Sequence, residues 1–277
     1  MKRTVRTAAV LSAAALVMTG CSAGDDTEGG ATQEGGLTTV TIGASPVPHA
    51  EILQFVQDEL AQDAGIDLEI QEFTDYVLPN TALDEGEIDA NFFQHLPYLD
   101  AQIAENGFEF DHYDGVHIEP YGIYSEKIED LDDLADGGVV GITNDPGNQG
   151  RALDLLVDAG LITLDETDGD PTLLDIAENP KDLEFVETAP EQLVVALPDV
   201  DIAIINGNYA LEAGLNPASD AILLESGEDN PYANVVVVRS EDLDDPALVT
   251  LDELLHSDEV RAFIEERWPA GEVIAAF

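Results

Sequence analysis

Short apolar runs alternate along this chain with segments whose apolar residues recur every three or four positions, and this alternation restricts the possible folds. Five runs have the length and β-branched composition of strands: TTVTIGA (38–44), IDLEIQEF (66–73), GVVGIT (138–143), DIAIIN (201–206) and NVVVVR (234–239). Helical spacing occurs between them, as at Ile52, Phe55, Val56 and Leu60. Strands that alternate with helices predict α/β sheets of mainly parallel strands.

The length of the chain sets the number of cores that it can form. About 240 residues follow the start of the first strand-like run, which is enough for one large domain or for two lobes. No internal repeat is visible in this part of the sequence. Both arrangements stay open on length alone.

Acidic residues dominate the charge of the chain. It has 59 Asp and Glu against nine Lys and Arg, and a formal net charge of −50. This balance excludes ordinary nucleic-acid binding, because no basic patch is present to displace counterions from phosphates. It also argues against docking on an anionic membrane through charge. Since 44% of the residues are hydrophobic and gather in compact runs, the acid belongs on the surface of a folded protein and indicates adaptation to concentrated salt.

The first 21 residues have the pattern of an export signal. Lys2, Arg3 and Arg6 precede an apolar stretch (8–17) that is too short to span a bilayer as a mature helix, which needs about 20 residues. The only cysteine, Cys21, follows Gly20 as in a bacterial lipoprotein signal, which this segment resembles. We expect lipidation at Cys21 and a protein anchored to the outer face of the cell membrane; the alternative is a plain signal peptide with a chance cysteine.

A polar segment follows the signal. Residues 22–36 are rich in Gly, Asp, Thr and Glu and have no large apolar side chain, so they predict a flexible tether. No later stretch is long enough and apolar enough for a transmembrane helix. The folded part is expected to begin near Leu37.

Sequence motifs of enzymes are missing from this chain. It contains no G-x-S-x-G, no G-x-x-x-x-G-K-[ST], no H-E-x-x-H and, after Cys21, no cysteine. Five histidines are scattered without ligand spacing, which leaves a zinc site built from distant residues as the alternative. We predict a binding protein with no catalytic residues, no cofactor and no metal.

Neutral polar and aromatic residues follow several predicted strands, where open α/β sheets bind ligands. Four clusters have this position: FTDYVLPN (73–80), DANFFQHLPYL (89–99), TNDPGNQGRAL (143–153) and INGNYA (205–210). Arg151 is one of few cations, and it lies in a helix that Asp145-Pro146 begins. An arginine there could hold a ligand carboxylate, or it could pair with Asp154 on the helix surface.

These clusters belong to a longer series of motifs in which the sequence resembles the NlpA/MetQ family of methionine-binding lipoproteins, the receptors of methionine ABC importers. The motifs are HAEIL, EFTDYVLPN, DANFFQHLPYL, HIEPYGIYS, NDPGNQGRAL, AIINGNYALEAGLNP and NPYANVVVVR. The resemblance covers residues 37–277. It implies a type II periplasmic-binding-protein fold with two α/β lobes and a ligand cleft between them. It also implies a first lobe of residues 37–120 and 228–277, and a second of residues 121–227.

The resemblance also implies a set of ligand-binding residues. Arg151 would hold the carboxylate of the amino acid, and Asn206 and Asn234 would bond its carboxylate and amino groups. Five residues would wall the slot for the thioether: Tyr76, Phe93, His95, Tyr98 and His117. Phe92 and Phe93 alternate across a strand, so only one of them can face the cleft. From the residues alone, Asn206 could stabilise a turn, His95 could cap a helix and Tyr98 could lie in the core.

The function that the resemblance implies is the capture of methionine, L or D, by a lipid-anchored, monomeric protein. It would deliver this ligand to a membrane permease with its ATPase. One alternative is a receptor of the same fold for a methionine-containing dipeptide or another amino acid. A second, of a different class, is an exported metal-binding lipoprotein.

Overall fold

The structure, a computed structural model, describes residues 36–277 except residue 168. The predicted signal segment, Cys21 and the predicted tether up to residue 35 lie outside the described residues. Within the part that is described, no helix has both the length and the apolar character needed to cross a membrane.

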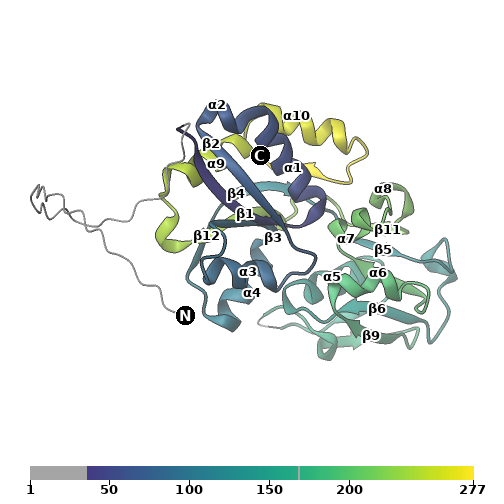
Figure 1. The fold of residues 1–277 in the computed structure, drawn as a ribbon. Coiled ribbons are helices and arrows are strands. Elements are labelled where there is room, and N and C mark those ends of the chain that lie inside the picture. The colour runs from purple at the N-terminus through teal and green to yellow at the C-terminus, as the bar shows by residue number, and fades with distance from the viewer. Residues whose placement is uncertain (1–35, 168) are drawn as a thin grey trace, which may run out of the picture. The chain divides into compact units, whose positions relative to one another are not determined.

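Two sheets form the framework of the described chain (Figure 1). The first has the order β13–β4–β12–β3–β1–β2 and consists of β1 (Thr38–Ala44), β2 (Ile66–Glu72), β3 (Ala90–His95), β4 (Phe110–Ile118), β12 (Ala233–Arg239) and β13 (Ile274–Ala275). The second has the order β11–β5–β10–β6–β9 and consists of β5 (Gly122–Tyr124), β6 (Val139–Thr143), β9 (Glu184–Thr188), β10 (Ile202–Ile205) and β11 (Leu223–Leu224). A separate pair is formed by β7 (Thr163–Leu164) and β8 (Ile176–Glu178).

Helices cover both faces of the first sheet. One face packs on α1 (Glu51–Val56), α9 (Pro246–Leu255) and α10 (Asp258–Arg267), and the other on α3 (Leu78–Asp84) and α4 (Leu96–Asn106). The short helix α2 (Gln62–Ala64) is exposed and precedes β2. Strand β12 shows why helices cover both faces. Val236 and Val238 join the core beneath α9 and α10, while Val235 and Val237 join the core beneath α3 and α4. Successive side chains of a strand point to opposite faces, so this continuous valine run serves two cores at once.

Four helices belong to the second sheet: α5 (Pro146–Asp158), α6 (Leu193–Ala196), α7 (Gly207–Glu212) and α8 (Pro217–Asp220). The chain crosses from the first sheet to the second between β4 and β5, and it returns between β11 and β12. The second sheet packs on its own buried cluster, which includes Ile123, Ile142 and Ile204. The prediction of two α/β lobes is confirmed.

The prediction of mainly parallel strands is wrong. Parallel pairs join β1 to β2 and β3, and β6 to β9 and β10. The other pairs of these two sheets are antiparallel: β3–β12, β4–β12, β4–β13, β5–β10 and β5–β11. Each antiparallel pair includes a strand next to one of the two crossings (β4, β5, β11 or β12), and an antiparallel strand can pair with its neighbour without the crossover helix that a parallel pair requires.

Helix α5 begins where the sequence predicted. Asp145 is the N-cap, and its carboxylate accepts a 2.9 Å hydrogen bond from the backbone N–H of Gly147. Pro146 occupies the first helical position, where its missing N–H leaves no carbonyl of the helix unpaired. This start fixes the rotation of α5 and therefore the direction of the side chains on its first two turns.

Candidate ligand-binding site

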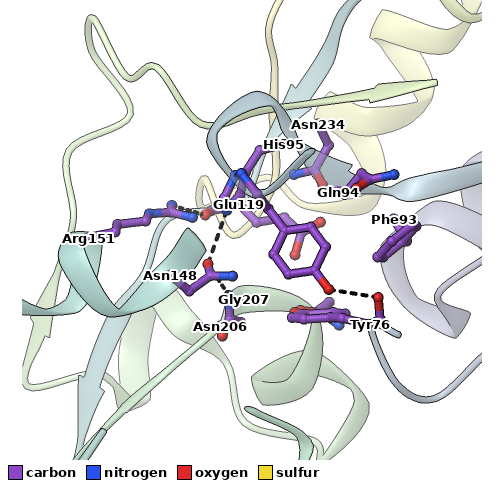
Figure 2. A pocket seen from close by; sticks show the side chains of 12 residues that line it. Tyr76, Phe93, Gln94, His95, Glu119, Asn148, Arg151, Asn206, Gly207 and Asn234 are labelled. Atoms are coloured by element: carbon purple, nitrogen blue, oxygen red, sulfur yellow. Dashed lines mark hydrogen bonds between the residues drawn. The ribbon is translucent and has the colours of Figure 1, made fainter. Parts of the chain in front are cut away.

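A small cavity with a free volume of about 20 Å³ lies where the two lobes meet (Figure 2). Twelve residues line it: Tyr76, Phe93, Gln94, His95, Tyr98, Glu119, Asn148, Arg151, Asn206, Gly207, Asn208 and Asn234. The lining combines one cation, one carboxylate, several amides and an aromatic wall.

Seven of the eight residues that the sequence proposed for the site line this cavity. They come from the loop before α3 and from β3, α4, α5, α7 and β12: Tyr76, Phe93, His95, Tyr98, Arg151, Asn206 and Asn234. Phe93 faces the cavity, while Phe92 packs in the core of the first lobe, as the alternation of the strand requires. His117 differs from the expectation, because it does not line the cavity but lies behind Glu119.

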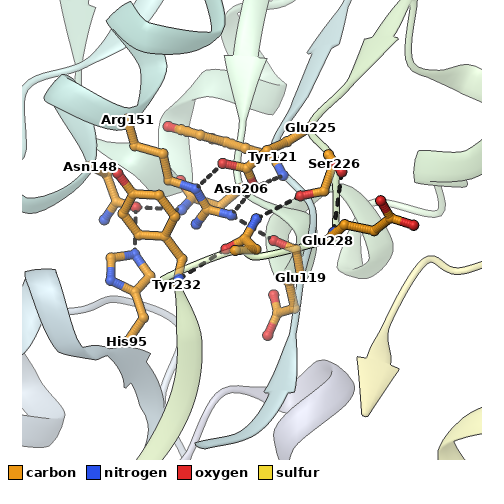
Figure 3. Close-up of polar contacts among 11 residues, drawn as sticks. His95, Glu119, Tyr121, Asn148, Arg151, Asn206, Glu225, Ser226, Glu228 and Tyr232 are labelled. Atoms are coloured by element: carbon orange, nitrogen blue, oxygen red, sulfur yellow. Dashed lines mark hydrogen bonds and ion pairs between the residues drawn. The ribbon is translucent and has the colours of Figure 1, made fainter. Parts of the chain in front are cut away.

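Arg151 is held by groups from both crossings between the lobes (Figure 3). Its Nε donates to Oε1 of Glu225 at 2.9 Å, and its Nη2 donates to Oε2 of Glu225 at 2.5 Å and to the backbone carbonyl of Glu119 at 2.9 Å. The guanidinium carbon lies 4.2 Å from the ring centre of Tyr232. The suggested pairing with Asp154 is absent among the described contacts, and its place is taken by an acid 74 residues along the chain.

This packing fixes the direction of the guanidinium. Two of its three nitrogens are engaged by Glu225 and the Glu119 carbonyl, whereas Nη1 makes no hydrogen bond to a described residue. Arg151 is 5% exposed and lines the cavity. A cation held in this way presents its remaining edge to an anion in the cavity at little cost in side-chain entropy.

Asn148, in the second lobe, connects polar side chains that line the cavity. Its Oδ1 accepts from Nδ2 of Asn206 and lies 3.0 Å from Nε2 of His95, and its Nδ2 donates to Asp145. Nδ1 of His95 accepts from the backbone N–H of Tyr98, so the ring proton is on Nε2, and Nε2 donates to Asn148. Burial and the nearby Arg151 lower the pKa of His95 to about 3, which keeps the imidazole neutral.

The second polar atom of the Asn206 side chain, Oδ1, has no hydrogen-bond partner among the described residues. Oδ1 of Asn206 is buried, and no described residue donates a hydrogen bond to it. A buried carbonyl oxygen without a donor costs about 1–3 kcal/mol. Since Asn206 lines the cavity, a ligand N–H is the group that would satisfy this oxygen.

Glu119 also lines the cavity, and the sequence reasoning missed it. The residue is 6% exposed, and one carboxylate oxygen, Oε1, lies 2.8 Å from Nε2 of His117 and 3.2 Å from Nε2 of His49. Burial raises the pKa of Glu119, while His49, Arg151 and the backbone N–H of Asn208 oppose that rise. Its position in HIEP was the available signal, but one acid among 59 does not stand out.

His49, His117 and Glu119 also form the one group in residues 36–277, leaving out 168, whose His, Cys or carboxylate atoms converge enough for a metal ion. The arrangement fits a metal poorly. Nε2 of His117 already bonds Glu119 and Nε2 of His49 already bonds Asn234. Among the described residues, neither Nδ1 has the hydrogen-bond partner that a ligating histidine almost always has. We therefore treat the three residues as a hydrogen-bonded cluster.

Aromatic rings close the opposite side of the cavity. The ring centre of Tyr76 lies 5.9 Å from that of Phe93, with the rings tilted by 40°, and 5.7 Å from that of Tyr98, which it meets edge-to-face. The hydroxyl of Tyr98 donates to the carbonyl of Tyr76 at 2.8 Å. The tyrosine hydroxyls are thus bonded away from the centre of the cavity, which leaves ring faces and edges as its wall.

Comparisons with known proteins agree with this fold. The model of the NlpA lipoprotein family matches residues 40–277. The methionine-binding lipoprotein MetQ of Bacillus subtilis is 42% identical over 264 residues, which is 93% of this chain and 95% of that protein. A nutrient-binding protein of Burkholderia cenocepacia, solved bound to methionine, has a TM-score of 0.83 and 43% identity over 86% of this chain and all of its own.

A third relative has a named role in transport. The periplasmic substrate-binding protein of an ABC transporter of Coxiella burnetii has a TM-score of 0.81 and 41% identity, over 86% of this chain and all of its own. These likenesses confirm the type II periplasmic-binding-protein fold and the resemblance seen in the motifs. The chain belongs to the NlpA lipoprotein family.

Proposed function

We propose that this protein is the substrate-binding component of an ABC importer and that it captures free methionine. The observation that carries the proposal is the pairing of opposite charges within one closed cavity. Arg151 offers the free edge of its guanidinium group to the cavity. Glu119 and Oδ1 of Asn206 line the same cavity and offer hydrogen-bond acceptors. A free amino acid is a zwitterion that needs both kinds of partner once it leaves water.

In this assignment each part of methionine has its own partner. The α-carboxylate pairs with Arg151, and the α-ammonium donates to Glu119 and Asn206. The thioether chain lies against Tyr76, Phe93 and Tyr98, since sulfur contacts with aromatic rings contribute very roughly 0.3–1.5 kcal/mol each. His95 and Asn234 complete the polar wall of the cavity, and His117 lies behind Glu119 and hydrogen-bonds it. Methionine is also the ligand in the Burkholderia structure and in the name of the Bacillus relative.

The mechanism follows from the two lobes. The open form admits the ligand, and closure removes water from the ligand carboxylate and Arg151. A ligand shifts this equilibrium only by its higher affinity for the closed form. We place the first lobe at residues 37–120 and 228–277 and the second at residues 121–227, because the two crossings between the sheets fall near these limits.

The partners of this protein are proposed on the same basis. A permease and an ATPase of an importer would receive the closed form, as the role of the Coxiella relative suggests. A lipid on Cys21 would hold the monomer at the outer face of the membrane, in keeping with a family of lipoproteins. The absence of enzyme motifs agrees with a receptor that binds its ligand and leaves it unchanged.

A thermal-shift screen tests the ligand. L- and D-amino acids and methionine dipeptides are added to the purified protein in high-salt buffer, which screens the repulsion of a chain with net charge −50. Methionine at 100 times its dissociation constant should add about 2.7 kcal/mol to the free energy of unfolding. A dipeptide should add nothing, because it separates the two charged ends beyond the reach of Arg151 and Glu119. Stabilisation by a dipeptide and not by methionine would contradict the proposal.

A further inference from the structure

Two histidines meet on one oxygen of Glu119. His117 lies at the end of β4, and His49 lies in the helical turn after β1 (Pro46–Ala50). Their Nε2 atoms are 2.8 Å and 3.2 Å from Oε1 of Glu119. His49 and His117 are 1% and 0% exposed, so neither histidine reaches solvent, and His117 does not line the cavity. Binding of the ligand does not use either ring directly.

The surroundings of the rings determine where their protons are. Neither Nδ1 has a hydrogen-bond partner among the described residues. Both rings pack edge-to-face against Phe92, with ring centres 4.8 Å and 5.2 Å away. An N–H at Nδ1 would be a buried donor without an acceptor, which is costly. The proton of each ring therefore lies on Nε2. From there His117 donates to Oε1 of Glu119, whereas His49 donates to Oδ1 of Asn234 at 3.1 Å and lies beside Glu119.

With its proton on Nε2, the His117 ring donates to Oε1 of Glu119, and a hydrogen bond donated to a carboxylate favours its ionised form against the effect of burial. Burial lowers the pKa of His49 to about 4 and that of His117 to about 3, so both rings stay neutral donors. The other groups that face Glu119 are Arg151, whose guanidinium bonds the Glu119 carbonyl, the backbone N–H of Asn208 and the neutral phenol of Tyr76. Apart from Arg151, these neighbours bring no full positive charge to the carboxylate.

We propose that His117, with His49 packed beside it, is a positioning residue that favours the ionised form of Glu119 and aims it at the ammonium group of the ligand. This inference rests on the proposed function. It gives methionine binding a pH dependence, because a proton on Glu119 competes with the ligand ammonium. Binding is complete while Glu119 is ionised and is lost as the pH falls through the pKa of Glu119.

His117 offers the cleaner test, since Glu119 is the only described residue whose side chain hydrogen-bonds it, whereas His49 bonds Asn234. In His117→Phe the ring shape is kept and the N–H is lost, so the pKa of Glu119 rises. In His117→Gln an amide N–H replaces Nε2–H and should restore the wild-type behaviour. Methionine affinity is measured by calorimetry from pH 4.5 to 7.5 for the full chain and both variants.

In His117→Phe the pH of half-maximal methionine affinity should move up by about one unit, so the loss of affinity relative to the wild type should grow to about tenfold as the pH falls below both values. The analogue 4-(methylthio)butanoate lacks the amine, so at pH 7 its affinity should be the same in both proteins. If His117→Phe does not fold, His117→Asn takes its place, because its shorter amide falls short of Glu119.

An unmoved pH profile, or an equal loss for methionine and the analogue, would overturn the positioning role. Such a result in a protein whose wild type binds methionine leaves the proposed function standing. Failure of the wild type to bind methionine at any pH would instead reject the proposed function itself.

Discussion

The hydroxyl of Tyr76 donates a 2.6 Å hydrogen bond to Oδ1 of Asn208, and this bond joins the two lobes across the cavity. Tyr76 precedes α3 in the first lobe, and Asn208 is the second residue of α7 in the second lobe. His95 and Asn148 make a further link of 3.0 Å between the lobes. All four side chains are buried. The ligand cavity is thus closed by bonds that an open form would break.

Replacing Tyr76 by Phe should weaken methionine binding about threefold to tenfold, because the closed form loses one hydrogen bond of about 0.5–1.5 kcal/mol. The aromatic wall remains in this variant. Tyr113→Phe is the matched control, since the Tyr113 hydroxyl bonds the carbonyl of Leu243 within the first lobe. Calorimetry should show a loss of affinity for Tyr76→Phe only, and equal affinities in both variants would refute the role of the bridge.

Removing the Arg151 side chain should almost abolish methionine binding. In Arg151→Ala a buried ligand carboxylate would face no cation, a loss of about 3–5 kcal/mol or more than a hundredfold in affinity. Glu225 would also lose its partner, so the variant Arg151→Ala/Glu225→Gln should be measured as well to separate stability from binding. Arg239→Ala, which changes an arginine remote from the cavity, should keep wild-type affinity. Unchanged calorimetric affinity in Arg151→Ala would reject this assignment.

Removing the charge of Glu119 should weaken the binding of ligands that have a free ammonium group and should not weaken the binding of ligands that lack one. Glu119→Gln keeps the size of the side chain but removes the charge opposite the ammonium, so methionine affinity should fall tenfold or more. The affinity of N-acetylmethionine, weak in the wild type, should not fall further. Glu272→Gln is the control, because Glu272 is a buried carboxylate that bonds Asn216 and does not line the cavity. If both substitutions reduce methionine affinity equally, the effect is on folding rather than on recognition.

His256 should make the stability of the fold depend on pH. The carboxylate of Asp252, whose Oδ1 lies 3.1 Å from Nδ1 of His256, raises the pKa of His256 from 6.5 to about 9, and the backbone carbonyl of Gly115 adds to this rise. Because the folded-state pKa is the higher one, the stabilisation is complete below pH 6.5 and is lost as the pH rises to 9. The free energy of unfolding of the wild type should fall between these pH values, and that of His256→Gln should fall less. Denaturant titrations at pH 6, 7.5 and 9 measure the difference.

Local pattern was enough to predict most elements of the fold. The strand predicted over 38–44 is β1, the helix predicted after Asp145 is α5, and the valine run before Arg239 is β12. These predictions succeed because periodicity and capping act between residues that are close in sequence. Strand direction was predicted wrongly, because pairing of β12 with β3 and β4 depends on where the chain returns after a whole lobe.

The sequence by itself determined the residue types at the strand ends, and through its motifs it determined the family, since both are written in short contiguous segments. Only the tertiary structure decided which partner each residue meets. In the folded protein Arg151 pairs with Glu225 and not with Asp154. Glu119 lies in the cavity wall, and His117 lies behind it. The physical reason is that charge pairing and burial depend on distances in space, and residues 74 positions apart acquire such a distance only when two lobes and their crossings are packed.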